Sequence, residues 1–113
     1  MARSFEQILA DAKAKRFDER AKNIRGSYRF DVAGKGSYRM EVDHGKVSFR
    51  EDRGPAECVI AADADDFARI IDGEQNVLTA YMQGRVQVDG NLGLAKVFHG
   101  AIGIARTPEV QQP

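Results

Sequence analysis

Only a few side chains in this 113-residue sequence are of the types that do acid–base, nucleophilic or metal chemistry. His44 and His99 are the only histidines, and Cys58 is the only cysteine. His44 follows Asp43 in a glycine-containing turn, and no cysteine or carboxylate stands at ligand spacing from His99 on its expected helix. Cys58 lies in an apolar run, where a thiol is normally inert. We therefore expect no metal, no cofactor and no catalytic residue, which disfavours a small hydrolase or isomerase.

The densest group of carboxylates is Asp63, Asp65 and Asp66. These residues lack the glycine and the spacing of an EF-hand calcium loop. They stand just before an apolar stripe of helical period, where Asp63 can cap the helix and the other two lie in the first turn. The helix dipole favours negative charge at that end. The group therefore predicts the start of a helix.

Without such a site, the sequence favours binding by burial of apolar groups. Residues 80–98 are the segment richest in apolar side chains. An apolar helical segment ends at Gly84, and a short strand over residues 85–89 follows, with Val86 and Val88 on one face. Gly90 turns the chain, and Asn91 is suited to cap a second apolar helix. These segments carry apolar residues on more than one face, which fits either a solid core or a partly hollow interior.

The elements that position this stretch begin with an amphipathic helix. Ser4 and Gln7 form a capping box, and apolar residues then recur at helical spacing. The pattern predicts a helix over residues 5–14 and leaves open its extension through Phe17 and Ala21.

From Gly26 the apolar period changes to two, which is typical of strands. Glycine-containing turns at residues 34–36 and 43–45 divide three such runs into an antiparallel meander with one apolar and one charged face. Within residues 57–62, the run from Cys58 to Ala62 is apolar without alternation and predicts an interior strand. A helix that Gly73 ends and a helix over residues 77–83, capped by Asn76, complete an α+β domain with a five-stranded sheet and helices on its apolar face.

Composition sets the general class of the protein. Lys and Arg number 17 against 17 Asp and Glu, so the overall charge gives no reason to expect a nucleic-acid partner. No apolar run approaches the ~20 residues that span a bilayer. A single cysteine fits a reducing compartment, and we expect a cytoplasmic protein. Residues 1–106 are expected to form one domain and residues 107–113 a flexible tail.

Several of these segments, taken in order, resemble a known family. Residues 81–84, 85–88 and 89–92 read YMQG, RVQV and DGNL, and upstream Asp65-Asp66-Phe67 is followed by Ile70 and Gly73. This order resembles the closing signature of the sterol carrier protein type 2 (SCP-2) family. That signature is a helix end with an aromatic residue and glycine, an apolar strand, an Asp-Gly pair and a leucine-rich helix. The resemblance covers roughly residues 24–104.

The resemblance implies a mixed sheet and an apolar tunnel between the sheet and the C-terminal helices. It further implies non-enzymatic binding, and possible transfer, of a fatty acid, acyl ester, sterol-like or other apolar ligand. The residues expected to bind the ligand are Phe30, Met40, Phe67, Ile71, Leu78, Tyr81, Met82, Leu94, Val97, Phe98 and Ile102. Tyr81 could also offer its hydroxyl to a polar head group. Contact with membranes would be transient at most, and a homodimer is allowed.

An alternative function is that of an accessory or interaction module. Domains of this family are found both alone and attached to enzymes, and the apolar groove would then receive a partner protein or a second copy of the chain.

Overall fold

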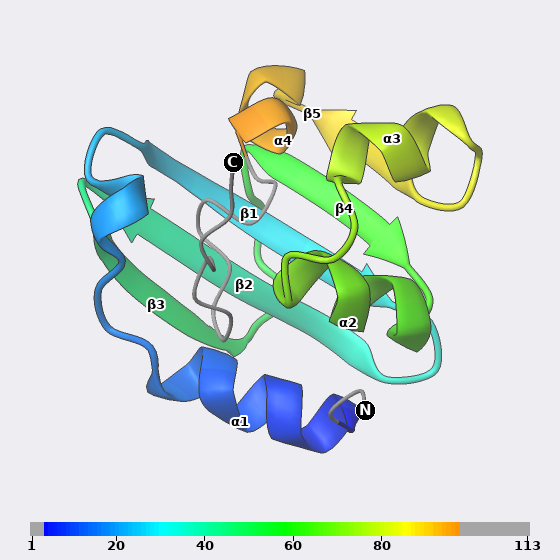
Figure 1. Cartoon of the computed structure of the whole chain (residues 1–113), viewed down its shortest axis with the longest axis horizontal. Coiled ribbons are helices and arrows are strands. Elements are labelled where there is room, and N and C mark those ends of the chain that lie inside the picture. The colour runs from blue at the N-terminus through cyan, green and yellow to red at the C-terminus, as the bar shows by residue number, and fades with distance from the viewer. Residues whose placement is uncertain (1–3, 98–113) are drawn as a thin grey trace, which may run out of the picture.

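The computed structural model describes residues 4–97, apart from the side chains of Arg20 and Val97. Its elements in chain order are α1 (Phe5–Ala14), the 3-10 turn η1 (Glu19–Ala21), β1 (Arg25–Val32), β2 (Gly36–Asp43), β3 (Lys46–Glu51), β4 (Cys58–Ala62), α2 (Ala64–Ile71), α3 (Val77–Met82), β5 (Gln87–Gly90) and α4 (Leu92–Val97). The strands form one sheet in the order β3-β2-β1-β4-β5. Figure 1 shows the helices gathered on one face of that sheet. The predicted α+β architecture is confirmed.

The predicted N-terminal helix is confirmed together with its capping box. The backbone N–H of Gln7 donates to the Ser4 hydroxyl at 3.1 Å, and the Gln7 side chain accepts from the Ser4 backbone N–H at 3.0 Å. Ile8 and Ala12, one turn apart, are buried against the sheet side of the helix. The amphipathic pattern thus places α1 as a cover over the apolar face.

The possible extension of this helix through Phe17 and Ala21 is wrong. Lys15 is already extended, with φ −70° and ψ 132°. The next residues pair with the free edge of β3 instead, because the Val47 N–H donates to the Arg16 carbonyl at 2.9 Å. The unpaired backbone groups at the edge of β3 therefore bind the residues after Ala14 in place of further helical hydrogen bonds.

The sheet is mixed. β1 pairs with β2 and β2 with β3 in antiparallel register, whereas β1 and β4 run parallel, and β5 is antiparallel to β4. β4 therefore lies inside the sheet between β1 and β5, as its unbroken apolar sequence predicts. Along β1 the alternation is plain: Tyr28, Phe30 and Val32 are buried under the helices, and Arg29 and Asp31 lie on the opposite face.

The charged face is partly covered by the crossover from β3 to β4. Arg29 donates to the carbonyls of Arg53 and Gly54, each at 3.3 Å, and Arg39 donates to the carbonyl of Pro55. The alternation predicts that this face of the sheet is open to water. Residues 52–57 shield part of the face, because two arginines on it bind the backbone carbonyls of this crossover.

The C-terminal elements start where their caps predict. The side chains of Asp63, Asn76 and Asn91 accept from the backbone N–H groups three residues later, at 2.7, 3.1 and 3.2 Å. β5 is shorter than expected, because the Arg85 N–H still donates to the Ala80 carbonyl at the end of α3. No helix within residues 4–97 is long and apolar enough to cross a membrane. The predicted tail lies outside the described residues.

Candidate apolar ligand site

The core beneath α1 and α2 is a close cluster of aromatic rings. Phe67 of α2 is at its centre, with ring centroids 5.4 Å from Phe30, 5.7 Å from Phe5 and 6.3 Å from Tyr38. Phe49 of β3 adds a further ring, 5.9 Å from that of Tyr38. Rings at these separations interlock and stabilise the structure beyond their burial alone. This half of the core is filled by large, rigid side chains.

The core beneath α3 and α4 is built differently. α4 contacts α3, β4 and β5, and Figure 1 shows α3 and α4 at the end of the sheet that carries β4 and β5. The buried side chains that these elements contribute are small or branched: Val77, Ala80, Cys58, Ile60 and Ala95. Such side chains offer little ring stacking and few polar atoms. This half of the core, which we term the aliphatic half, is lined mainly by apolar groups of modest size, with the buried Tyr28 ring beneath α4.

The short helix α4 is attached to the sheet by two hydrogen bonds. The Tyr28 hydroxyl donates to the Leu94 carbonyl at 2.9 Å, and the Ala95 N–H donates to the Cys58 sulfur. Burial raises the pKa of the Cys58 thiol to about 11, and it also raises the pKa of Tyr28, helped by the nearby Cys58 and Glu57. Both groups therefore stay neutral at physiological pH. Cys58 is a structural thiol, as its apolar setting predicts.

The Leu94 side chain of α4 packs onto Gly26 of β1. A Cβ atom at Gly26 would lie 2.7 Å from a methyl carbon of Leu94, so a larger residue there would push that side chain aside. The sequence favours close helix–sheet packing for Gly93, but among the described residues a Cβ there would meet only the side chain of Asn91. Within the described part of the chain, the glycine beneath α4 is thus on the strand.

A polar network fixes the segment that joins α2, α3 and β5. The Asp66 carboxylate is 6% exposed and accepts from Arg69 at 2.7 Å and from Arg85 at 2.9 Å. Arg85 also donates to the side chains of Gln75 and Gln83. Burial alone would raise the pKa of Asp66, but the hydrogen bonds from Arg85 and Arg69 outweigh it and hold that pKa below its usual value. The network ties both ends of α3 to α2.

The structure brings some of the predicted ligand residues together and separates others. Phe30, Met40, Phe67 and Ile71 are buried on the helix-covered face of the sheet, and Leu78 and Leu94 are half-buried against that core. Tyr81 and Met82 are different, because they are 40% and 78% exposed. They lie on the solvent side of α3, and their contact with a ligand stays a prediction.

Three further predicted residues are not placed. The side chain of Val97 and the whole of Phe98 and Ile102 lie outside the described residues, as does His99. His44 is described: it occupies the tight β2–β3 turn with φ 50°, and its Nδ1 lies 2.7 Å from the Asp43 carboxylate.

Two hollows are found in the described part of the molecule. One, of about 520 Å³, has a mixed lining, with the polar residues Asp31, Ser37, Asp63, Arg85 and Gln87 beside the apolar residues Val32, Ala33, Ala61 and Ala62. The other, of about 400 Å³, is lined by Arg25, Ser27, Arg39, Glu41, Glu57 and their neighbours. None of the predicted ligand residues that the structure describes borders either hollow. The tunnel within the apolar layer therefore stays a prediction.

Sequence reasoning missed two contributors to this region. Tyr28 belongs to the predicted apolar face of its strand, but nothing local indicates that its hydroxyl holds a helix 66 residues later. Asp66 is predicted as a first-turn acid, but its partner Arg85 is distant in sequence. The one usable signal is that Asp66 precedes Phe67 and stands four residues before Ile70, on the buried side of α2.

The comparisons with known proteins agree with the fold. The model of the SCP-2 sterol transfer family matches residues 5–103. Hydroxysteroid dehydrogenase-like protein 2 of Xenopus tropicalis is 28% identical over 90 residues, which are 76% of this chain and 22% of that protein. The chain thus spans about a fifth of the length of the curated relatives it matches.

Solved structures show the same architecture. The sterol carrier protein 2 of Aedes aegypti, solved in complex with palmitate, has a TM-score of 0.61 at 21% identity and covers 93% of this chain and 97% of that one. The sec-alkylsulfatase of Pseudomonas sp. has a TM-score of 0.59 at 19% identity and covers 74% of this chain but 14% of that one. With the family model matching almost the whole described chain, the protein belongs to the SCP-2 sterol transfer family.

Proposed function

We propose that this domain binds, without catalysis, a lipid-like molecule with a long apolar chain, in the aliphatic half of the core beneath α3 and α4. The observation that carries the proposal is the contrast between the two halves of the core. Interlocked rings fill the space under α1 and α2, whereas the space under α3 and α4 is lined mainly by Val77, Ala80, Ile60 and similar side chains, with the single Tyr28 ring beneath α4. A flexible chain fits such a lining more readily than a ring cluster.

Desolvation supplies the binding energy for such a ligand. Each methylene moved from water to an apolar site contributes ~0.8 kcal/mol, so a long chain needs no directed chemistry to be held. α4 is the element best suited to move aside for the ligand. It is only six residues long, and it is held by hydrogen bonds to Tyr28 and Cys58 and by the packing of Leu94 on Gly26. The palmitate complex of the Aedes aegypti relative supports a fatty acid as the first ligand to test.

The test is a titration of the full chain with a fluorescent fatty acid, displaced by unlabelled palmitate. Leu78 of α3 and Leu9 of α1 form a matched pair, since both are half-buried leucines packed against the core. Leu78→Trp should fill the aliphatic half and weaken binding by about tenfold or more, whereas Leu9→Trp should leave the affinity within about twofold. Absence of saturable binding by the unaltered chain would refute the proposal. Equal effects of the two substitutions would move the site elsewhere.

A second function is favoured by one observation. The chain corresponds to about a fifth of the hydroxysteroid dehydrogenase-like relatives and to 14% of the sec-alkylsulfatase. A domain of this kind that accompanies enzymes could present an apolar molecule to a catalytic domain or dock onto a partner. Native mass spectrometry separates the two functions, because retained lipid supports carriage and a ligand-free dimer supports an interface.

A further inference from the structure

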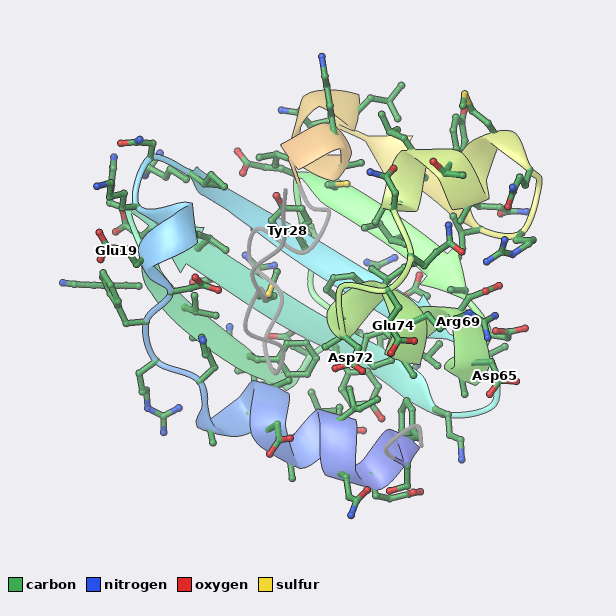
Figure 2. All side chains as sticks on the ribbon, in the orientation of Figure 1. Glu19, Tyr28, Asp65, Arg69, Asp72 and Glu74 are labelled. Carbon is green, nitrogen blue, oxygen red and sulfur yellow. The ribbon has the colours of Figure 1, made fainter. Side chains whose placement is uncertain are left out.

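Two short segments of the sheet, one in β1 and one at the start of β4, hold α4. In β1, the Tyr28 hydroxyl donates to the Leu94 carbonyl at 2.9 Å, and the Leu94 side chain packs on Gly26. At the start of β4, the Cys58 sulfur accepts from the Ala95 N–H. Figure 2 shows Tyr28 on β1, close to α4. The place of α4 on the sheet therefore depends on how these two segments lie relative to each other.

Ser27 and Glu57 tie the two segments together. The Ser27 backbone N–H donates to Glu57 Oε1 at 3.0 Å, and the Glu57 backbone N–H donates to the Ser27 hydroxyl at 2.9 Å. The two hydrogen bonds are reciprocal, since each residue supplies its backbone donor to the side chain of the other. The parallel ladder between β1 and β4 begins with Tyr28 and Cys58, the next residue of each segment. The pair thus adds one rung to this ladder at the point where α4 is attached.

Glu57 also binds the residue that caps α4. Its carbonyl accepts from the Asn91 N–H at 2.8 Å, and the Asn91 side chain accepts from the Leu94 N–H at 3.2 Å. The same carbonyl lies so close to Gly90 that a Cβ atom there would be 2.3 Å from the oxygen. Glu57 therefore links β1, through its side chain and its N–H, to the start of α4, through its carbonyl.

The contacts of the crossover do not fix Glu57 in another way. Arginines on the charged face of the sheet bind carbonyls of the crossover, but these contacts end at Pro55. For the part of the chain that the structure describes, the hydrogen bonds of Glu57 are those with Ser27 and Asn91. Ser27 and Glu57 border the hollow of about 400 Å³ on the charged face. Substitution of either side chain therefore removes these hydrogen bonds without leaving a cavity in the apolar core.

We infer that Ser27 and Glu57 are positioning residues, which together hold α4 over the aliphatic half of the core and so set how fast the ligand enters and leaves. The inference rests on the proposed function, in which α4 is the element that moves aside for the ligand. It adds the control of that movement, by two polar residues that border the charged face of the sheet and not the apolar layer.

A positioning role of this kind has a kinetic signature. If the ligand enters and leaves only when α4 has moved aside, loss of the pair increases the fraction of open molecules, and both rate constants rise by the same factor. The dissociation constant is the ratio of the two rate constants, so it stays nearly unchanged. One hydrogen bond of this kind corresponds to about a fivefold change in the open fraction. A direct contact with the ligand would instead raise the release rate alone and weaken the affinity.

The test mixes the full chain with a fluorescent fatty acid in a stopped-flow instrument, which gives the association and dissociation rate constants separately. Ser27→Ala removes the acceptor of the Glu57 N–H, and Glu57→Ala removes the acceptor of the Ser27 N–H. Each should raise both rate constants by about fivefold, with the dissociation constant within about twofold. Ser27→Thr and Glu57→Gln keep an acceptor oxygen and should bring both rate constants to within about twofold of the unaltered chain.

The matched control is Ser37→Ala. The Ser37 hydroxyl also lies on the charged face, where it donates to the Asp31 carboxylate at 2.8 Å near the other end of β1. This variant loses a serine hydrogen bond of the same kind, but it should leave both rate constants unchanged. Circular dichroism melts verify that each variant is folded.

Amide exchange of the ligand-free chain is the second measurement. Ser27→Ala and Glu57→Ala should speed the exchange of the Leu94 and Ala95 amides by about fivefold and leave the amides of α1 unchanged. If the unaltered chain binds no fatty acid, the proposed function fails, and faster exchange confined to α4 would then support the positioning role of the pair.

Four results would overturn the inference. The first is a pair of alanine variants whose rate constants and α4 exchange match those of the unaltered chain. The second is a rise in the release rate alone, with a matching loss of affinity. The third is failure of Ser27→Thr and Glu57→Gln to restore the rates, because the hydrogen bonds would then not be the cause. The fourth is an equal effect of Ser37→Ala, which would assign the change to the loss of any hydroxyl on this face.

Discussion

Asp66 of α2 and Arg85, 19 residues later, meet at 2.9 Å with the carboxylate almost fully buried. The pair spans α3, and Arg69 and two glutamines complete it, so the helix proposed to cover the ligand is held at both ends. A buried carboxylate without its cations would lower the free energy of unfolding strongly. We therefore expect the stability of the α2–α3–β5 segment to be most sensitive to substitutions at this pair.

Asp66→Asn should lower the free energy of unfolding by about 1.5–3 kcal/mol at neutral pH, because it removes charged hydrogen bonds. Urea denaturation measures this change. Asp65→Asn is the control, since Asp65 is exposed in the same first turn. If Asp65→Asn lowered the free energy of unfolding by a similar amount, the effect would come from negative charge in the first turn of α2 and not from the Asp66–Arg85 pair.

The pH dependence of the same variant follows from the lowered pKa of Asp66. A carboxyl whose pKa is lower in the folded than in the unfolded state stabilises the fold above the unfolded pKa of ~3.9, and the contribution is lost as pH falls through the folded pKa. The difference in unfolding free energy between the unaltered chain and Asp66→Asn should therefore be full at pH 6–7 (about two units above ~3.9) and vanish in acid. A difference that stays constant down to the acid transition would contradict the assignment.

The turn between β5 and α4 gives a prediction about backbone geometry. Gly90 has φ +89°, and a Cβ there would collide with the carbonyl oxygen of Glu57. Gly34 has φ +74°, and no atom of the described residues lies near its Cβ position. Gly34→Ala should cost about 1–2 kcal/mol for the left-handed conformation alone, and Gly90→Ala a further ~1–3 kcal/mol for the clash. Equal losses in thermal melts of the two variants would mean that the strand end adjusts freely.

The sequence predicts much of the fold because the signals are local. Alternation in β1–β3, the unbroken apolar run of β4 and the caps at Ser4, Asp63 and Asn76 each act within a few residues. The extension of α1 fails because a distant strand edge competes for residues 16–18. Which face of α3 is buried could not be predicted either. Its sequence VLTAYM has no charge, so Val77 and Ala80 point inward and Tyr81 and Met82 outward for reasons of tertiary packing.

The hydrogen bond from Tyr28 to Leu94 should hold α4 on the sheet. Tyr28→Phe removes the donor and should cost about 1–2 kcal/mol of stability, with faster amide exchange in α4 than in α1. Tyr38→Phe is the matched control, because its hydroxyl makes a longer bond, 3.3 Å, to the Lys35 carbonyl at the rim of the sheet. Unchanged exchange in α4 would show that Leu94 packing against Gly26 suffices to hold it.

Ligand-linked stabilisation should report where the fatty acid lies. A ligand that binds only the folded state stabilises it by about 2.7 kcal/mol at a free concentration 100 times its dissociation constant. Amides that exchange by local opening should be slowed most in α3 and α4, which cover the aliphatic half of the core, and least in α1, which covers the ring cluster around Phe67. At the same ligand concentration, Leu78→Trp should reduce both effects to about half or less, and Leu9→Trp should leave both unchanged. Protection concentrated in α1, with α3 and α4 unaffected, would place the ligand among the aromatic rings and reverse the assignment of the two halves.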